Sequence, residues 1–213
     1  RIAVDSRTFL YTLGFRTQYW SKNREFFISP RAVVSYQPNW NKDVLFRGAI
    51  GSYNQSPFYR EFRDKEGVLY TDLKSQKSTH FVFSTDYNFL SWNRPFKFVG
   101  EIYYKSLRNL IPYEIDNLRL RYLPSLTSHG YTAGLDLRVN GEFVSGVESW
   151  ASMSLMKSEE DIEGDGHGYI PRPTDQRFAF SLFFQDYFPG NPSYKMNLKL
   201  HYSSGLPTGA VNS

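Results

Sequence analysis

Residues 131–140 read YTAGLDLRVN, and apolar and polar side chains take turns along the whole stretch. The odd positions are apolar, and they are Tyr131, Ala133, Leu135, Leu137 and Val139. The even positions are polar or glycine. Successive side chains of a β-strand point to opposite faces, so a period of two over ten residues predicts a strand with one apolar and one polar face.

The same alternation recurs along the chain, while helical periodicity is nearly absent. It predicts nine strands, which are Phe9–Tyr19, Ile28–Gln37, Val44–Tyr53, His80–Phe89, Phe96–Lys105, Tyr131–Asn140, Val147–Met156, Phe178–Gln185 and Lys195–Ser203. Many of them run about ten residues, the length of a tilted membrane strand. We therefore expect an all-β, antiparallel, up-and-down fold.

Short and long connections alternate between these strands. The short ones are rich in Pro, Gly, Asn and Ser, and they are Pro38–Asp43, Leu90–Pro95, Asn140–Ser145 and Phe188–Ser193. The long ones are Asn54–Lys77, Ser106–Ser128 and Ser158–Asp175, and the short Ser21–Glu25 is an exception on their side. In an antiparallel meander this order puts all four of the short turns listed first on one edge, and the long connections with Ser21–Glu25 on the other. Outer-membrane barrels have that asymmetry, with the long loops outside the cell.

The composition narrows the class of protein further. The 213 residues contain no cysteine, which excludes a disulfide scaffold and a thiolate metal site. The net charge is +4 and no basic run stands out, so we expect no nucleic-acid partner. Aromatic residues make up 18% of the chain and gather near predicted strand ends, where membrane barrels carry interfacial girdles. A soluble β-sandwich with an aromatic core is the alternative.

Several motifs, taken in order, resemble the barrel domain of TonB-dependent outer-membrane receptors in the form found in Bacteroidetes. They are SPRAVVSYQP at 29–38, FRGAIGSY at 46–53, SPFY at 56–59, DLKSQKS at 72–78, EIYYKSLRNLI at 101–111, the strand-and-turn unit at 130–141 and SGLPTG at 204–209. Each motif is short, and their common order and spacing carry the resemblance, which covers most of the chain.

The resemblance implies a barrel of about 22 strands, plugged by an N-terminal domain. Residues 1–213 would be part of the C-terminal half of that barrel, with the plug and the other strands outside this chain. It also implies uptake of a scarce solute across the outer membrane of a Gram-negative bacterium, with energy supplied by TonB through the plug. The expected partners are outer-membrane lipid, TonB, the solute and a surface lipoprotein. Siderophore, glycan, peptide and vitamin all remain open as the solute. The alternatives are a complete small outer-membrane barrel or a soluble β-domain for binding or adhesion.

No catalytic constellation stands out, so we expect no enzyme activity, cofactor or metal. The four histidines show no metal-ligand spacing, and no nucleophile elbow occurs, which disfavours a barrel hydrolase. The acidic run at 159–165 supplies oxygen ligands for a divalent cation, but a solvated loop is the favoured interpretation.

Two sets of residues remain as candidates for solute contact. Loop aromatics and basic residues suit ligand capture, although they suit packing between loops equally well, and they are Tyr59, Arg60, Phe62, Tyr70 and His167. Charged residues on the polar strand faces would face the lumen, and they are Arg16, Arg31, Arg47, Asp86, Glu101, Lys105, Asp136, Arg138 and Lys199. Charge pairing between neighbouring strands is the alternative role for this second set.

Overall fold

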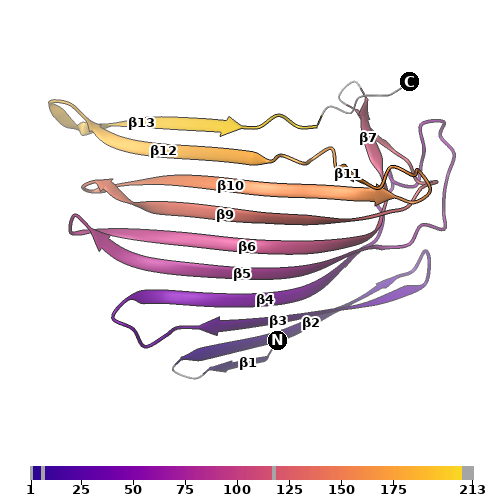
Figure 1. The fold of residues 1–213 in the computed structure, drawn as a ribbon, viewed down its shortest axis with the longest axis horizontal. Coiled ribbons are helices and arrows are strands. Elements are labelled where there is room, and N and C mark those ends of the chain that lie inside the picture. The colour runs from indigo at the N-terminus through magenta and orange to yellow at the C-terminus, as the bar shows by residue number, and fades with distance from the viewer. Residues whose placement is uncertain (1, 6–7, 117–118, 208–213) are drawn as a thin grey trace.

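A computed structural model describes residues 2–5, 8–116 and 119–207. Eleven strands form one antiparallel sheet, and two more form a small separate hairpin (Figure 1). The strands of the large sheet are β1 (Ile2–Asp5), β2 (Phe9–Trp20), β3 (Glu25–Tyr36), β4 (Asp43–Gln55), β5 (Gln76–Ser91), β6 (Arg94–Leu110), β9 (Ser128–Val144), β10 (Val147–Ile162), β11 (Tyr169–Pro171), β12 (Phe178–Phe188) and β13 (Asn191–Ser203). The hairpin consists of β7 (Tyr113–Asp116) and β8 (Arg119–Tyr122). Within the described ranges, no helix is long and apolar enough to cross a membrane.

The large sheet is a meander, as the alternation of turns and loops predicted. Its order is β1-β2-β3-β4-β5-β6-β9-β10-β12-β13, with β11 added beside β10. All nine predicted strands are present in this order. Four short strands, β1, β7, β8 and β11, were not predicted. The pairing ends at β1 on one side and at β13 on the other, so the sheet has two edges in this chain.

The strands are longer than predicted, because several segments assigned to connections continue the sheet. β6 and β9 each have 17 residues, and β10 runs on through much of the acidic stretch, as far as Ile162. The predicted turn at 140–145 lies instead at residues 145 and 146, where Gly146 takes a positive φ of 79°. The turn between β5 and β6 is only Trp92-Asn93, both with positive φ, which is the two-residue geometry that suits a twisted hairpin.

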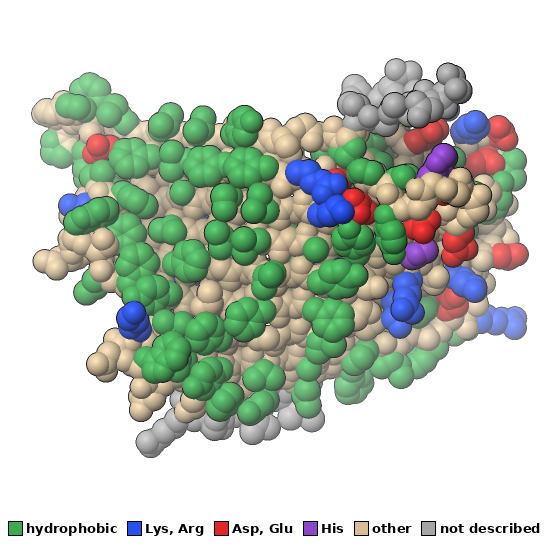
Figure 2. Space-filling view, viewed as in Figure 1, with side chains coloured by type: hydrophobic (Ala, Val, Ile, Leu, Met, Phe, Trp, Pro, Cys, Tyr) green, Lys and Arg blue, Asp and Glu red, His purple; other side chains and the backbone are tan. Residues whose placement is uncertain are grey.

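The pairing register puts the predicted apolar rows of all nine strands on one side of the sheet. One row of paired residues runs across it through Tyr11, Val34, Gly48, Phe83, Ile102, Leu135, Leu155 and Phe178. On β13 the same side carries Met196, Leu198, Leu200 and Tyr202. We call this side the apolar face and the opposite side the polar face. Figure 2 shows hydrophobic side chains spread over most of the sheet.

These apolar side chains are largely exposed. Phe15 is 77% exposed, Ile102 58% and Leu198 57%. Among the described residues, the buried hydrophobic side chains are few, and they are Val44, Phe62, Phe96, Tyr103, Leu110, Ile111 and Val147. The sheet is therefore one layer, without a second layer packed against its apolar face.

The connections divide between the two edges as predicted. The short turns lie on one edge, on the left in Figure 1, except the β2–β3 turn at 21–24, which lies with the long connections on the other edge as expected. We call these the turn edge and the loop edge. The loop edge carries residues 56–75, residues 111–127 with the β7–β8 hairpin, and residues 163–177 with β11.

Candidate functional site

The long connection 56–75 is fixed to its neighbours by side chains from three strand ends. The Glu25 carboxylate accepts hydrogen bonds from the Ser75 backbone N–H at 3.3 Å and from its hydroxyl at 2.8 Å. The Asn23 amide donates to the Leu73 carbonyl at 2.7 Å, and the Asn109 amide donates to the Ser75 carbonyl at 3.2 Å. These bonds hold the connection between the β2–β3 turn and the end of β6.

Phe62 packs inside this connection and does not face solvent. Its side chain is only 6% exposed, with the Trp20 ring 6.2 Å away and the Lys22 ammonium 3.7 Å from its centroid. The neighbouring Glu61 is equally covered and accepts hydrogen bonds from the Phe58 backbone N–H and the Gln76 amide. For Phe62, therefore, packing between loops describes the structure better than the predicted solute contact.

Tyr59 and Arg60 project from the same connection and pair with each other. Tyr59 is 75% exposed, and the Arg60 Nε donates to its hydroxyl at 2.9 Å. The β7–β8 hairpin comes close to this point. Burial and the Glu61 carboxylate raise the pKa of Tyr122, while the Arg60 charge lowers it. The charges of the connection 56–75 therefore lie within electrostatic range of the β7–β8 hairpin.

A hollow of about 600 Å³ opens at the loop edge, where all three long connections meet. We call it the loop hollow. Its lining is Leu69, Tyr70, Thr71, Asp72, Leu73, Lys74, Asn109, Leu110, Ile111, Pro124, Ser125, Leu126, Thr127 and Glu163. The Glu163 backbone N–H donates to the Thr127 carbonyl at 2.9 Å, which joins the third connection to the second. Carboxylate, ammonium, amide, hydroxyl and aromatic groups therefore line one cavity, as expected for a site that binds a polar solute.

Of the five predicted loop residues, only Tyr70 lines the loop hollow. His167 is exposed in the connection 163–177, where its backbone N–H donates to the Asp165 carboxylate at 2.9 Å. The sequence analysis missed Asp72, Lys74, Asn109 and Glu163. Asp72, Lys74 and Asn109 lay inside quoted motifs and Glu163 inside the acidic run, but no spacing marked them as one site, because the hollow joins three segments far apart in the chain.

The first four residues of the acidic run, 159–162, lie in β10 and not in the solvated loop that the sequence favoured, which begins only at Glu163. Glu160 lies in β10 and is 2% exposed. Its carboxylate accepts a hydrogen bond from the Ser128 hydroxyl at 2.8 Å and lies 3.6 Å from Arg172. The strand continues through these residues because neighbouring elements supply partners for the carboxylates.

All nine predicted charged residues lie on the polar face, as the register of their strands requires. Asp86 accepts two hydrogen bonds of 3.2 Å from Arg47 and lies 2.9 Å from the Lys97 ammonium. Arg31 lies over Tyr53, Lys105 over Tyr103 and Arg138 over Trp150. Pairing between strands therefore occurs at Arg47 and Asp86. The set holds six cations, at 16, 31, 47, 105, 138 and 199, and three carboxylates.

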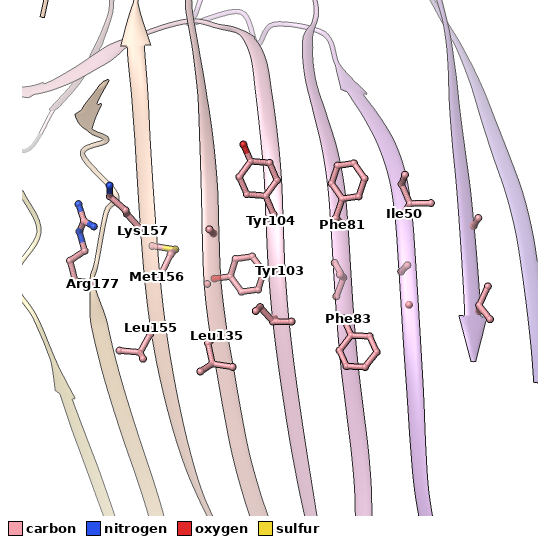
Figure 3. A pocket seen from close by; sticks show the side chains of 18 residues that line it. Ile50, Phe81, Phe83, Tyr103, Tyr104, Leu135, Leu155, Met156, Lys157 and Arg177 are labelled. Carbon is pink, nitrogen blue, oxygen red and sulfur yellow. The ribbon is translucent and has the colours of Figure 1, made fainter. Parts of the chain in front are cut away.

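Rows of aromatic rings flank the apolar face. Near the turn edge, rings stack or meet edge to face from β2 to β9, and they are Phe9, Tyr36, Trp40, Phe46, Tyr87, Phe89, Trp92, Phe96 and Phe143. Toward the loop edge, Tyr131 stacks on Tyr104 and contacts Tyr169 edge to face. Between the rows runs an apolar hollow of about 1010 Å³, which ends at Lys157 and Arg177 (Figure 3).

No family model, curated protein or solved structure matches the chain. Three features of the fold bear on function, and they are the exposed apolar face, the charged polar face and the loop hollow.

Proposed function

We propose that this chain is part of the wall of an outer-membrane β-barrel receptor that takes up a scarce solute with energy supplied through TonB. The observation that carries the proposal is the apolar face, which stays in register from β2 to β13 and is exposed. Eighteen large apolar side chains on it are more than a third exposed, and they are Phe9, Tyr11, Leu13, Phe15, Tyr19, Phe26, Ile28, Val34, Ile50, Phe81, Phe83, Ile102, Tyr104, Leu155, Met196, Leu198, Leu200 and Tyr202.

The size of this face favours lipid over water as its surroundings. At roughly half of about 170 Å² each, those side chains expose on the order of 1,500 Å². The largest apolar patch on a typical soluble monomer is only about 300–600 Å². A lipid bilayer removes this surface from water, and the paired strands already satisfy their backbone groups, as a membrane requires.

The spacing of the aromatic rows also fits a bilayer. Ten residues of β9 separate the level of Tyr131 from that of Gly141, which pairs with Phe96. At about 3.3 Å per residue and a tilt of about 40°, that span is roughly 25 Å along the membrane normal. The apolar band of outer-membrane barrels is about 25 Å tall.

The two open edges favour a piece of a larger barrel. Lipid does not tolerate unpaired backbone groups, so β1 and β13 need partner strands. On this proposal other strands of the receptor supply them, the polar face lines the lumen, and the loop hollow faces the outside and contacts the solute. The carboxylates, Lys74 and Tyr70 of the hollow favour a polar solute.

Two experiments test the proposal. Because the chain has no cysteine, single-cysteine variants L135C and D136C place one label on each face. In outer membranes that contain the full gene product, a lipid-soluble nitroxide should quench a fluorophore at 135 far more than one at 136. Equal quenching refutes the barrel. Sequencing the gene upstream tests the receptor, since a plug-like domain is expected there and a small stand-alone gene would refute TonB coupling.

A further inference from the structure

The apolar face does not end in apolar residues on β10. Its alternating positions are Met153, Leu155, Lys157 and Glu159, so a lysine follows directly after the last aliphatic side chain. Arg177, just before β12, reaches the same place, with its guanidinium 3.4 Å from Glu159. Figure 3 shows Lys157 and Arg177 beside each other, at the border of the apolar hollow.

The two cations face outward and their carboxylate partners lie beneath them. The side chains of Lys157 and Arg177 are 47% and 46% exposed, against 14% for Glu159 and 2% for Asp175. Lys157 is 2.9 Å from Glu159, and Arg177 is 2.6 Å from Asp175. The carboxylates fix the positions of two neighbouring cations, whose remaining N–H groups are free to bind an anion from outside.

Two tyrosines flank these cations at the border of the aliphatic surface. The Tyr131 hydroxyl donates to Glu159 at 2.6 Å, and its ring lies 5.7 Å from the Lys157 ammonium. Tyr104 stacks on Tyr131 at 6.0 Å. By pairing through Ala133, Tyr104 lies at the level of Lys157, and Tyr131 lies two residues further toward the loop edge, opposite Glu159. The apolar hollow is thus followed directly by exposed cations with tyrosines beside them, a juxtaposition that matches the acyl chain and the anionic head group of a lipid at the interface.

We propose that Lys157 and Arg177 bind the phosphate of a lipid head group whose acyl chains lie along the apolar face. The inference rests on the proposed function, because it needs a bilayer around this face. Exposure selects the head group, because the two cations face outward while the two carboxylates that offset their charge are covered. Arg offers a fork of donors to phosphate oxygens and Lys a mobile point charge, and the two together match a phosphate better than a neutral or zwitterionic head group.

The test uses the full gene product, in which β1 and β13 have their partner strands, in a neutral maltoside detergent. A fluorescent single-chain lipid with a phosphate monoester head is titrated in, and anisotropy gives its affinity. A monoacylglycerol of equal chain length is the uncharged comparison. The K157Q/R177Q variant should bind the phosphate lipid about 30-fold more weakly, roughly five-fold for each cation. The K157R/R177K variant should keep the affinity, and K42Q/K195Q, which removes two cations near the turn edge, should not change it.

Each outcome decides the question. Equal binding of the two lipids, or unchanged affinity in K157Q/R177Q, overturns the head-group site. If millimolar inorganic phosphate displaces the fluorescent phosphate lipid as well as unlabelled phosphate lipid does, the assignment to a lipid is overturned. If the protein self-associates and this association blocks lipid binding, the surface binds a second copy of the protein and the inference is also overturned. Flotation with neutral vesicles is measured separately. Failure to float refutes the proposed membrane location itself, whereas flotation without phosphate-lipid selectivity refutes only this inference.

Discussion

Placing a positive charge at position 83 is the sharpest test of what surrounds the apolar face. Phe83 lies in the row with Ile102 and Leu135 and is 52% exposed. Four residues of β9 separate Leu135 from the level of Tyr131, and six separate it from the level of Phe96. These spans correspond to about 10 Å and 15 Å along the normal, which puts position 83 close to the bilayer midplane.

Under the membrane proposal, the F83R variant should lose about 2–4 kcal/mol of folding free energy, the cost of Arg at the midplane of a barrel. The adjacent Val82 faces the other side of the sheet, where it pairs with Tyr103, so V82R is the matched control. We expect V82R to lose clearly less, since a lumen is wet. Charges at Leu135 or Leu198 should repeat the result for F83R.

Guanidinium unfolding from phosphatidylcholine vesicles, followed by tryptophan fluorescence, measures both variants of the full gene product against the unsubstituted protein. A shift of 2–4 kcal/mol for F83R, with little change for V82R, supports lipid around the apolar face. If water surrounded that face, an arginine at a half-exposed position would cost only a few tenths of a kcal/mol. Equal stability of F83R and V82R would therefore refute the membrane orientation of the sheet.

Three further results are expected. F62A should cost about 3–5 kcal/mol locally, because it empties a buried aromatic site in the connection 56–75, so limited proteolysis should cut there faster than in Y59A. D86N leaves Arg47 and Lys97 facing each other without a counter-charge and should lower the unfolding free energy by about 1–3 kcal/mol in the guanidinium assay. Protease added to intact cells should cut within 163–177 and spare the turn at 37–42.

Each of these results has a clear opposite. Equal cleavage of F62A and Y59A would mean that Phe62 does not anchor the connection. An unchanged midpoint in D86N would mean that the carboxylate does not stabilise its two cations. Cutting at the turn edge alone would invert the orientation of the sheet, and cutting at both edges would mean that no membrane separates them.

The sequence predicted well which side chains lie on which face of the sheet. Within a strand, this assignment depends only on the alternation of neighbouring residues. Leu135 and Asp136 point to opposite sides wherever the strand lies, so alternation alone assigns each to its face. The meander order followed from short connections, which leave a strand no choice but to pair with the next. Strand ends were predicted less well. β9 continues past Asn140-Gly141, a pair that usually marks a turn, because β6 and β10 supply partners on both sides.

The candidate site was the least predictable part, for a physical reason. The loop hollow is formed where residues 69–74, 109–111, 124–127 and 163 come together, and these segments share no local pattern. Phe62 and Tyr70 look alike in sequence, yet one packs beneath Lys22 and the other lines the hollow. What separates them is the anchoring of the connection by Glu25 and Asn23, 50 residues earlier in the chain.

The two faces of the sheet place different demands on substitution, and this difference links the fold to the proposed function. If lipid surrounds the apolar face, as proposed, a side chain there needs only to be apolar, since lipid adapts to its shape. On the polar face each charge needs a partner or water, and Asp86 between Arg47 and Lys97 shows how neighbouring strands supply one. On the proposed function, a solute that passes the polar face meets Asp86 already held between Arg47 and Lys97, while other cations such as Arg138 lie over aromatic rings. We therefore expect selectivity to depend strongly on the loop hollow, whose lining gathers Asp72, Lys74 and Glu163.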